Sequence, residues 1–173
     1  MMLLCSRKLS YVQRWGIVPV IRKQSVAEHS FGVAAISVWL AGMSRQACDR
    51  AEVLEYALLH DINEAITGDV PSTFKRYIKD AIVGFESKIP DAEVCELTKV
   101  VVKLADYLEA LAYINEEKSF GNSTLGLIEA DMLPLFDTAY DKFTMLGVKP
   151  DSRAFLRNFL DEVHPNRHPG LVV

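Results

Sequence analysis

A histidine and an aspartate stand next to each other at His60-Asp61, in the C-terminal part of a strongly apolar stretch. An imidazole nitrogen and a carboxylate oxygen suit a borderline divalent cation such as Zn²⁺, Mn²⁺, Co²⁺ or Fe²⁺. Because adjacent helical residues point about 100° apart, both side chains reach one ion only where the edge of the helix faces it. The dipeptide alone is weak evidence, since a helix-end histidine beside a solvated aspartate has the same sequence.

Two more residues of the same kinds fall on neighbouring predicted helices. His29 lies in the first turn or so of the preceding helix, and Asp106 lies in the middle of a later one, among residues typical of a core. A carboxylate in such a place is costly to bury unless it is paired or ligated. The two imidazoles and two carboxylates could surround one ion and leave positions on it open for water and substrate.

Helical patterns extend over most of the chain. The capping pattern of Ser25 and Glu28 begins a helix that ends near Arg45, and Asp49 begins a second helix that ends at Gly68. The remaining helical ranges are 74–89, 91–121, 125–146 with a break near Pro134, and 152–163. No alternation of strands and helices, internal repeat or linker is present, so we expect one all-α domain. Its predicted parts are the motif-bearing core in 10–112, the C-terminal helices in 123–163 and a loose tail in 164–173.

The composition fits one globular domain and excludes a disordered or fibrous protein, because half of the 173 residues are hydrophobic and 24% are charged. A net charge of −4 provides no overall positive field for a nucleic-acid polymer or an anionic membrane. Cys5, Cys48 and Cys95 are scattered, so neither a disulfide scaffold nor a thiolate zinc site is expected. With no signal-peptide pattern and no run of roughly 18 apolar residues, we expect a cytoplasmic protein without a membrane partner.

The motifs resemble those of the HD-domain phosphohydrolases, namely Glu28-His29-Ser30, His60-Asp61 and Lys103-Leu104-Ala105-Asp106. With Arg14-Trp15, Glu64 and the Thr67–Pro71 segment, the set is similar to the HD-domain 5′-deoxynucleotidases of bacteria and their small phage relatives, which include dATP triphosphohydrolases. The resemblance covers roughly residues 10 to 112 and implies a single HD-domain helical bundle in the bacterial cytosol, encoded by a bacterium or a phage. It implies one divalent metal ion (Co²⁺, Mn²⁺, Zn²⁺ or Fe²⁺) ligated by His29, His60, Asp61 and Asp106.

The resemblance also implies roles for residues near the metal. Glu64 follows Asp61 by three residues and would act as general acid and base, although an exposed helix carboxylate has the same spacing. Arg14 would grip a phosphate and stabilise its charge, and Trp15 would pack on the nucleoside and exclude a 2′-hydroxyl. Without the resemblance, a surface arginine beside a core tryptophan is the simpler interpretation. Ile17 would pack against the base or belong to the core.

The segment after the second predicted helix would complete the substrate site. Asp69 would accept a hydrogen bond from the sugar 3′-hydroxyl, or it is an ordinary turn aspartate. Lys103 shares a helical face with Asp106 and Lys75 lies in a basic stretch, so both are candidate phosphate cations. The other expected substrate contacts are Val70, Pro71, Ser72 and His29.

The sequence therefore predicts a metal-dependent phosphohydrolase whose substrate is a small-molecule deoxynucleotide. Water would attack the α-phosphorus and the 5′-oxygen would leave. A monophosphate substrate would make the protein a 5′-deoxynucleotidase and a triphosphate a dNTP triphosphohydrolase of the dATP type, and the metal motif does not separate the two. A non-catalytic nucleotide-binding HD module and a helical interaction protein are the alternatives. Tyr107, Tyr113 and Ile114 add to an apolar surplus that suggests self-association as a dimer or larger homo-oligomer.

Overall fold

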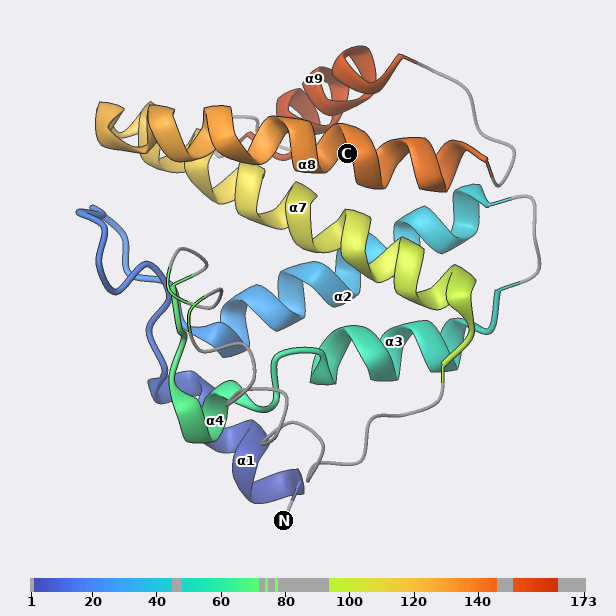
Figure 1. Cartoon of the computed structure of the whole chain (residues 1–173), viewed down its shortest axis with the longest axis horizontal. Helices are drawn as coiled ribbons and strands as arrows, with labels where there is room; N and C mark the ends of the chain where they lie inside the picture. The colour runs from blue at the N-terminus through green and yellow to red at the C-terminus, as the bar shows by residue number, and fades with distance from the viewer. Residues whose placement is uncertain are drawn as a thin grey trace, which may run out of the picture.

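Two long helices, α2 (Val26–Met43) and α7 (Glu96–Ser119), cross at the centre of the molecule (Figure 1). The structure is a computed structural model that describes residues 2–44, 48–71, 74, 77, 94–145 and 151–164. Helix α3 (Arg50–Leu59) packs on α2, α8 (Gly126–Thr144) packs on α7, and α9 (Ser152–Glu162) contacts both α7 and α8. The short elements are α1 (Met2–Lys8), η1 (Leu9–Tyr11), α4 (Glu64–Thr67) and η2 (Ser123–Leu125).

The described residues are helical apart from turns, loops and one isolated antiparallel bridge between Gln13 and Ser25. The predicted all-α fold class is therefore confirmed. The capping box at Ser25 is also present, since its hydroxyl accepts from the backbone N–H of Glu28 while the Glu28 carboxylate accepts from the Ser25 N–H. This pair fixes the start of α2, and with it the place of His29.

The core lies where α2, α7, α8 and α9 meet. Leu40 of α2 and Leu108 of α7 are fully buried, and Tyr140 of α8 packs on Phe155 of α9 with ring centroids 5.0 Å apart. Burial of each such side chain contributes about 1.5–3 kcal/mol. The core therefore holds α2 and α7 rigidly against each other, and these two helices carry His29 and Asp106.

The segment 12–25 folds back on itself and is fastened to α7. Its ends are joined by the Arg14 N–H to the Gln24 carbonyl and by the Val26 N–H to the Val12 carbonyl, both 2.9 Å. Further along, the buried carboxylate of Glu117 accepts two backbone N–H groups of this segment. Hydrogen bonds within the segment and to α7 thus hold this loop in place.

Helix α2 is, among the described helices, the one long and apolar enough to cross a membrane by length and composition. The mean hydropathy of Val26–Met43 is 1.3, although polar residues such as Ser30 and Ser37 interrupt the apolar run. In this fold the helix packs against α3 and α7 and contributes Val33 and Leu40 to the core.

The predicted single helix from Asp49 to Gly68 is wrong, because α3 ends at Leu59 and α4 begins at Glu64. Between them the backbone makes the tighter hydrogen bonds of 3₁₀ turns, each to the carbonyl three residues earlier. These bonds run from the Ile62 N–H to the Leu59 carbonyl and from the Glu64 N–H to the Asp61 carbonyl. The continuous apolar pattern did not show this break. The α-helical hydrogen-bonding pattern ends at the histidine–aspartate pair itself.

Two other predicted boundaries are also wrong. Helix α7 begins at Glu96 rather than Asp91, because Cys95 is extended and its sulfur accepts from the Thr98 N–H as N-cap. Helix α8 passes through Pro134 without a break, since packing of buried residues beyond that point, such as Phe136, holds the helix together. The predicted helix over 152–163 is confirmed by α9.

Tyr113 and Ile114 do not form a self-association face, because their exposed fractions are 2% and 0%. They pack with Leu125 in a second small core under the 12–25 segment. The predicted helix over 74–89 and the predicted loose tail over 164–173 lie almost wholly outside the described residues. Self-association and the single-domain boundaries stay predictions.

Candidate functional site

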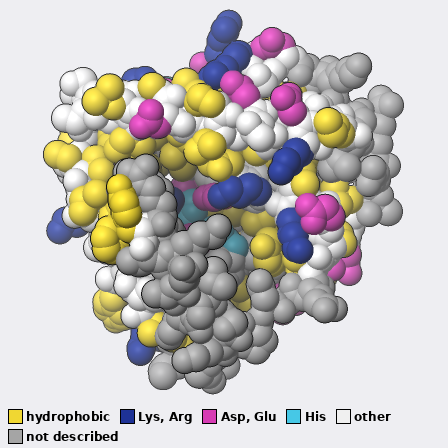
Figure 2. All heavy atoms as spheres, in the orientation of Figure 1, with side chains coloured by type: hydrophobic (Ala, Val, Ile, Leu, Met, Phe, Trp, Pro, Cys, Tyr) yellow, Lys and Arg dark blue, Asp and Glu magenta, His cyan; other side chains and the backbone are white. Residues whose placement is uncertain are grey.

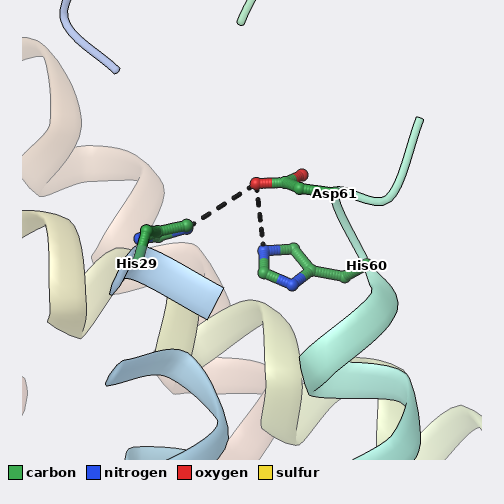
Figure 3. A group of neighbouring side chains, drawn as sticks. All are labelled: His29, His60 and Asp61. Atoms are coloured by element: carbon green, nitrogen blue, oxygen red, sulfur yellow. Dashed lines mark ion pairs between the residues drawn. The ribbon is translucent and has the colours of Figure 1, made fainter. Parts of the chain in front are cut away.

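The structure brings His29, His60, Asp61 and Asp106 together at the point where α2, α7 and the end of α3 meet. Figure 3 shows Asp61 pointing toward both imidazoles. Its Oδ2 lies 3.7 Å from Nε2 of His29 and 3.3 Å from Nε2 of His60. On the other side, Oδ1 of Asp106 lies 3.2 Å from Nε2 of His29. Ligand atoms of His29, His60 and Asp61 all lie within 4.8 Å of one another.

The partners of the other ring nitrogens determine the tautomers of the two histidines. Nδ1 of His60 lies 2.7 Å from the carbonyl oxygen of Ala57, which can only accept, so Nδ1 carries the proton. Nδ1 of His29 contacts Oε2 of Glu109, which also only accepts as a carboxylate. In both rings Nε2 is therefore the nitrogen that faces the carboxylates. The bond from Nδ1 of His60 to the Ala57 carbonyl also caps the C-terminal end of α3.

These donor atoms fit a metal ion. The Nε2 atoms of His29 and His60 are both buried and make no hydrogen bond. Each faces carboxylate oxygens, and such an arrangement is stable only when a positive charge, either a ring proton or a metal ion, lies between nitrogen and oxygen. Two imidazole nitrogens and carboxylate oxygens are the ligands that zinc and related divalent cations take.

The charges of the cluster shift its pKa values strongly. Burial lowers the pKa of His29, but Asp106 and Glu109 more than reverse this effect and raise it to about 9. The pKa of His60 is also raised, since Asp61 outweighs burial. Burial would raise the pKa of Asp106, yet His29 and Lys103 hold it well below its usual range. Both carboxylates are therefore ionised at neutral pH, and the raised histidine pKa values show that the cluster favours a positive charge at Nε2, which a proton or a metal ion can supply.

A cavity of about 440 Å³ opens above this cluster. This volume lies within the range of small-molecule sites. Asp61 and Asp106 lie in its wall, and Figure 2 shows histidine side chains at the base of a hollow flanked by acidic and basic side chains. An apolar wall comes from α8 through Ile128, Met132 and Leu135. The sequence interpretation missed this wall because these residues resemble an ordinary helix face.

Nearly all of the other predicted site residues line the same cavity: Arg14, Trp15, Ile17, Glu64, Asp69, Val70, Pro71 and Lys103. Glu64 is buried at the first position of α4. Ile17 is 70% exposed, so its alternative assignment to the core is wrong, and it lies at the rim. Nζ of Lys103 lies 2.8 Å from Oδ2 of Asp106. Ser72 and Lys75 lie outside the described residues.

Sequence reasoning also missed a polar network behind the cavity. Oε2 of Glu109 accepts from Nη1 of Arg14 at 3.2 Å, and Oε1 accepts from Nε2 of Gln24 at 2.6 Å. The Oε1 of Gln24 in turn accepts from the side chains of Arg14 and Trp15, each at 3.3 Å. Glu109 follows Asp106 by three residues on α7. This spacing places both side chains on the same face of the helix, and it is the sequence signal that could have identified Glu109.

The family model described as 5′-deoxynucleotidase YfbR-like matches residues 2–94 of the chain. A dATP triphosphohydrolase of Salmonella phage PMBT28 is 34% identical over 123 residues, which cover 63% of this chain and 63% of that protein. The 5′-deoxynucleotidase PM0747 of Pasteurella multocida (strain Pm70) is 30% identical over 125 residues, which cover 66% of this chain and 63% of that protein. The match thus spans less than two thirds of the length of each of these two relatives.

A similar fold occurs in the Cyanophage S-2L HD phosphohydrolase (DatZ), whose structure was solved bound to dA and one catalytic Zn²⁺ ion. The TM-score is 0.63 at 22% sequence identity, and the match covers 94% of this chain and 96% of that one. At this identity the likeness establishes a shared fold.

Proposed function

This chain belongs to the YfbR-like 5′-deoxynucleotidase family, and on that premise we propose that it is a metal-dependent phosphohydrolase acting on deoxynucleotides. The observation that carries the proposal is the convergence of two buried imidazole nitrogens without hydrogen bonds, and two ionised carboxylates, under a cavity of about 440 Å³. Relatives named dATP triphosphohydrolase and 5′-deoxynucleotidase support the substrate class. A small-molecule deoxynucleotide is therefore the proposed partner.

His29, His60, Asp61 and Asp106 are the residues that would hold the divalent ion. Such an ion supplies positive charge that offsets the phosphoryl oxygens and lowers the pKa of a water molecule. In the overall reaction the water oxygen bonds to the α-phosphorus, the bond from phosphorus to the 5′-oxygen breaks, and the deoxynucleoside leaves. The other product is phosphate or a longer phosphate chain.

The residues around the cavity divide the remaining tasks. We assign the proton that the 5′-oxygen takes up to Glu64, whose buried carboxylate lines the cavity. Lys103 and Arg14 are the cations of the described cavity wall, and they would bind phosphoryl oxygens. Nη1 of Arg14 is already engaged by Gln24 and Glu109, so its orientation is fixed before substrate binds.

Trp15 and Asp69 would position the nucleoside. Both line the cavity, and the indole offers a flat face against which a sugar or base can pack. A ring in that place leaves little room for a 2′-hydroxyl, which is a steric means of preferring deoxynucleotides.

The test is phosphate release from deoxynucleoside mono-, di- and triphosphates of each base, with added Co²⁺, Mn²⁺ or Zn²⁺. Release of inorganic phosphate from monophosphates identifies a 5′-deoxynucleotidase, and release of triphosphate from dNTPs identifies a triphosphohydrolase. The Asp106→Ala variant should lose both activity and bound metal, whereas Asp141→Ala, on the exposed face of α8, should keep both. Tight nucleotide binding without turnover under all conditions would instead favour a non-catalytic binding module.

A further inference from the structure

We propose that Glu109 is a positioning residue of the metal site, because its carboxylate fixes the tautomer and the orientation of His29. The inference rests on the proposed function in one respect, since it takes His29 to be a metal ligand.

The first argument is the chemistry of the His29 ring. His29 is fully buried, so water cannot determine which nitrogen carries the proton. Its Nδ1 contacts Oε2 of Glu109, and we assign the ring proton to Nδ1 because a carboxylate oxygen can only accept. Nε2 is then the nitrogen on the side of Asp61 and Asp106, and the one available to ligate an ion. A carboxylate behind a ligating histidine also raises the basicity of the ligating nitrogen.

The second argument is that Glu109 is itself held in place. Nε2 of Gln24 donates to its Oε1 at 2.6 Å, and Nη1 of Arg14 donates to its Oε2 at 3.2 Å. Nη1 of Arg14 and Nδ1 of His29 both contact Oε2 of Glu109, and the two nitrogens lie 2.5 Å apart. The side chain of Glu109 is 12% exposed, and its position is determined by these contacts rather than by solvent.

The third argument is the space that α2 leaves for the carboxylate. Gly32 lies three residues after His29, on the same helical face. A Cβ built on Gly32 would lie 2.8 Å from Cγ of Glu109 and 3.3 Å from its Oε1. Any side chain at this position would force Glu109 to move. The close approach of α2 and α7 at Gly32 therefore permits the contact between Glu109 and His29.

A competing explanation is that Glu109 serves only as the ion-pair partner of Arg14. In that case its removal would affect folding and phosphate binding, but not the affinity for a metal ion in the absence of substrate. The two explanations thus differ in metal binding by the substrate-free protein.

The experiment is a titration of metal-free protein with Co²⁺, followed by its visible absorption, which reports the ligands directly. Glu109→Ala should weaken Co²⁺ binding about 10–100-fold, as loss of such a partner does in other metal sites. Glu109→Gln keeps an acceptor oxygen for Nδ1 and should lose less. Gly32→Ala should weaken binding in the same direction, because it displaces Glu109 without removing a polar group.

Glu116→Ala is the matched control, since Glu116 is on the same helix and pairs with Arg22 away from the metal ligands. Its Co²⁺ affinity should stay within twofold of the unmodified protein. Glu109→Ala with unchanged Co²⁺ affinity and spectrum would overturn the proposal. If Glu109→Ala does not fold, as judged by circular dichroism, unchanged affinity in Glu109→Gln and Gly32→Ala would overturn it equally. Failure of the unmodified protein to bind Co²⁺ would count against the proposed function itself.

Discussion

The indole of Trp15 stacks on the phenol ring of Tyr113, with ring centroids 5.2 Å apart and ring planes 9° from parallel. Trp15 has a φ of 63°, a backbone conformation that costs energy for a side chain of this size. The stack, together with the bond from the indole N–H to Gln24, holds the residue there. Because Tyr113 lies behind Trp15 and outside the described cavity wall, we expect it to act on the substrate site mainly through that ring.

Tyr113→Leu should therefore raise KM for a deoxynucleotide by about 2- to 10-fold, which corresponds to the 0.5–1.5 kcal/mol of an aromatic pair. Tyr113→Phe keeps the ring and loses only the hydrogen bond from the Tyr113 hydroxyl to the Arg22 carbonyl, so its KM should stay near that of the unmodified protein. Steady-state kinetics of the two variants at saturating metal provide the measurement. Equal KM values in both would show that the stack does not position Trp15 for substrate.

Glu117 should make the stability of the protein depend on acid pH. Its buried carboxylate accepts from the N–H groups of Ile21 and Arg22 and from the side chain of Asn122, each at 2.7 Å. Burial raises its pKa, but these donors outweigh burial and lower the pKa. A lowered pKa in the folded state means that the stabilisation is present above the unfolded value of about 4.3 and is lost as pH falls through the folded value.

At pH 7 the Glu117→Gln variant should lose about 1–3 kcal/mol of unfolding free energy, because an amide accepts these bonds less well and adds a donor. The difference from the unmodified protein should shrink as pH falls below the unfolded-state value of about 4.3, because uptake of a proton by Glu117 then removes the same stabilisation. Urea denaturation at several pH values measures both quantities. A difference that stays constant down to pH 3 would contradict the assignment.

The sequence predicted those parts of the site that depend on local patterns. Ser25 and Glu28 place His29 at the start of α2 because a capping box is a local arrangement. Asp106 was noticed because a carboxylate among core residues needs a partner, and the structure places it beside His29 and Lys103. The all-α class followed from helical periodicity in the same way.

The parts that were missed depend on contacts between distant segments. Helix α7 begins at Glu96 because Cys95 caps it, and the carboxylate of Glu52 on α3 holds this cap by accepting from Cys95 and Thr98, a contact that no local pattern shows. Glu109 resembles a surface residue until α2 brings His29 and Gly32 against it. Contacts between helices distant in the sequence thus determine both the start of α7 and the position of Glu109.

Metal binding should stabilise the fold. The ligands come from α2, from the turn after α3 and from α7, so an ion bound between them is retained only while these segments stay together. At 100 times its Kd a ligand adds about 2.7 kcal/mol, which corresponds to roughly 5–11 °C in Tm for a domain of this size. Thermal unfolding with and without Co²⁺ measures the shift, and EDTA should reverse it. His60→Ala should abolish the shift, and a full shift in that variant would remove His60 from the ligand set.

Lys103 should bind the phosphate rather than the nucleoside. Burial lowers the pKa of Lys103, but the adjacent Asp106 more than reverses this effect, so the ammonium stays charged at neutral pH. It extends into the cavity from the same helix face as Asp106. A hydrogen bond to a charged group contributes about 1.5–3 kcal/mol, so Lys103→Met should lower kcat/KM by roughly 10- to 100-fold.

The deoxynucleoside product carries no phosphate, so its inhibition constant should change less than twofold in Lys103→Met. Lys99→Met is the control, because Lys99 is an exposed lysine one turn earlier on α7 and outside the described cavity wall. Its kcat/KM should match that of the unmodified protein. If Lys103→Met weakened the deoxynucleoside and the nucleotide equally, the side chain would be shaping the cavity rather than binding phosphate.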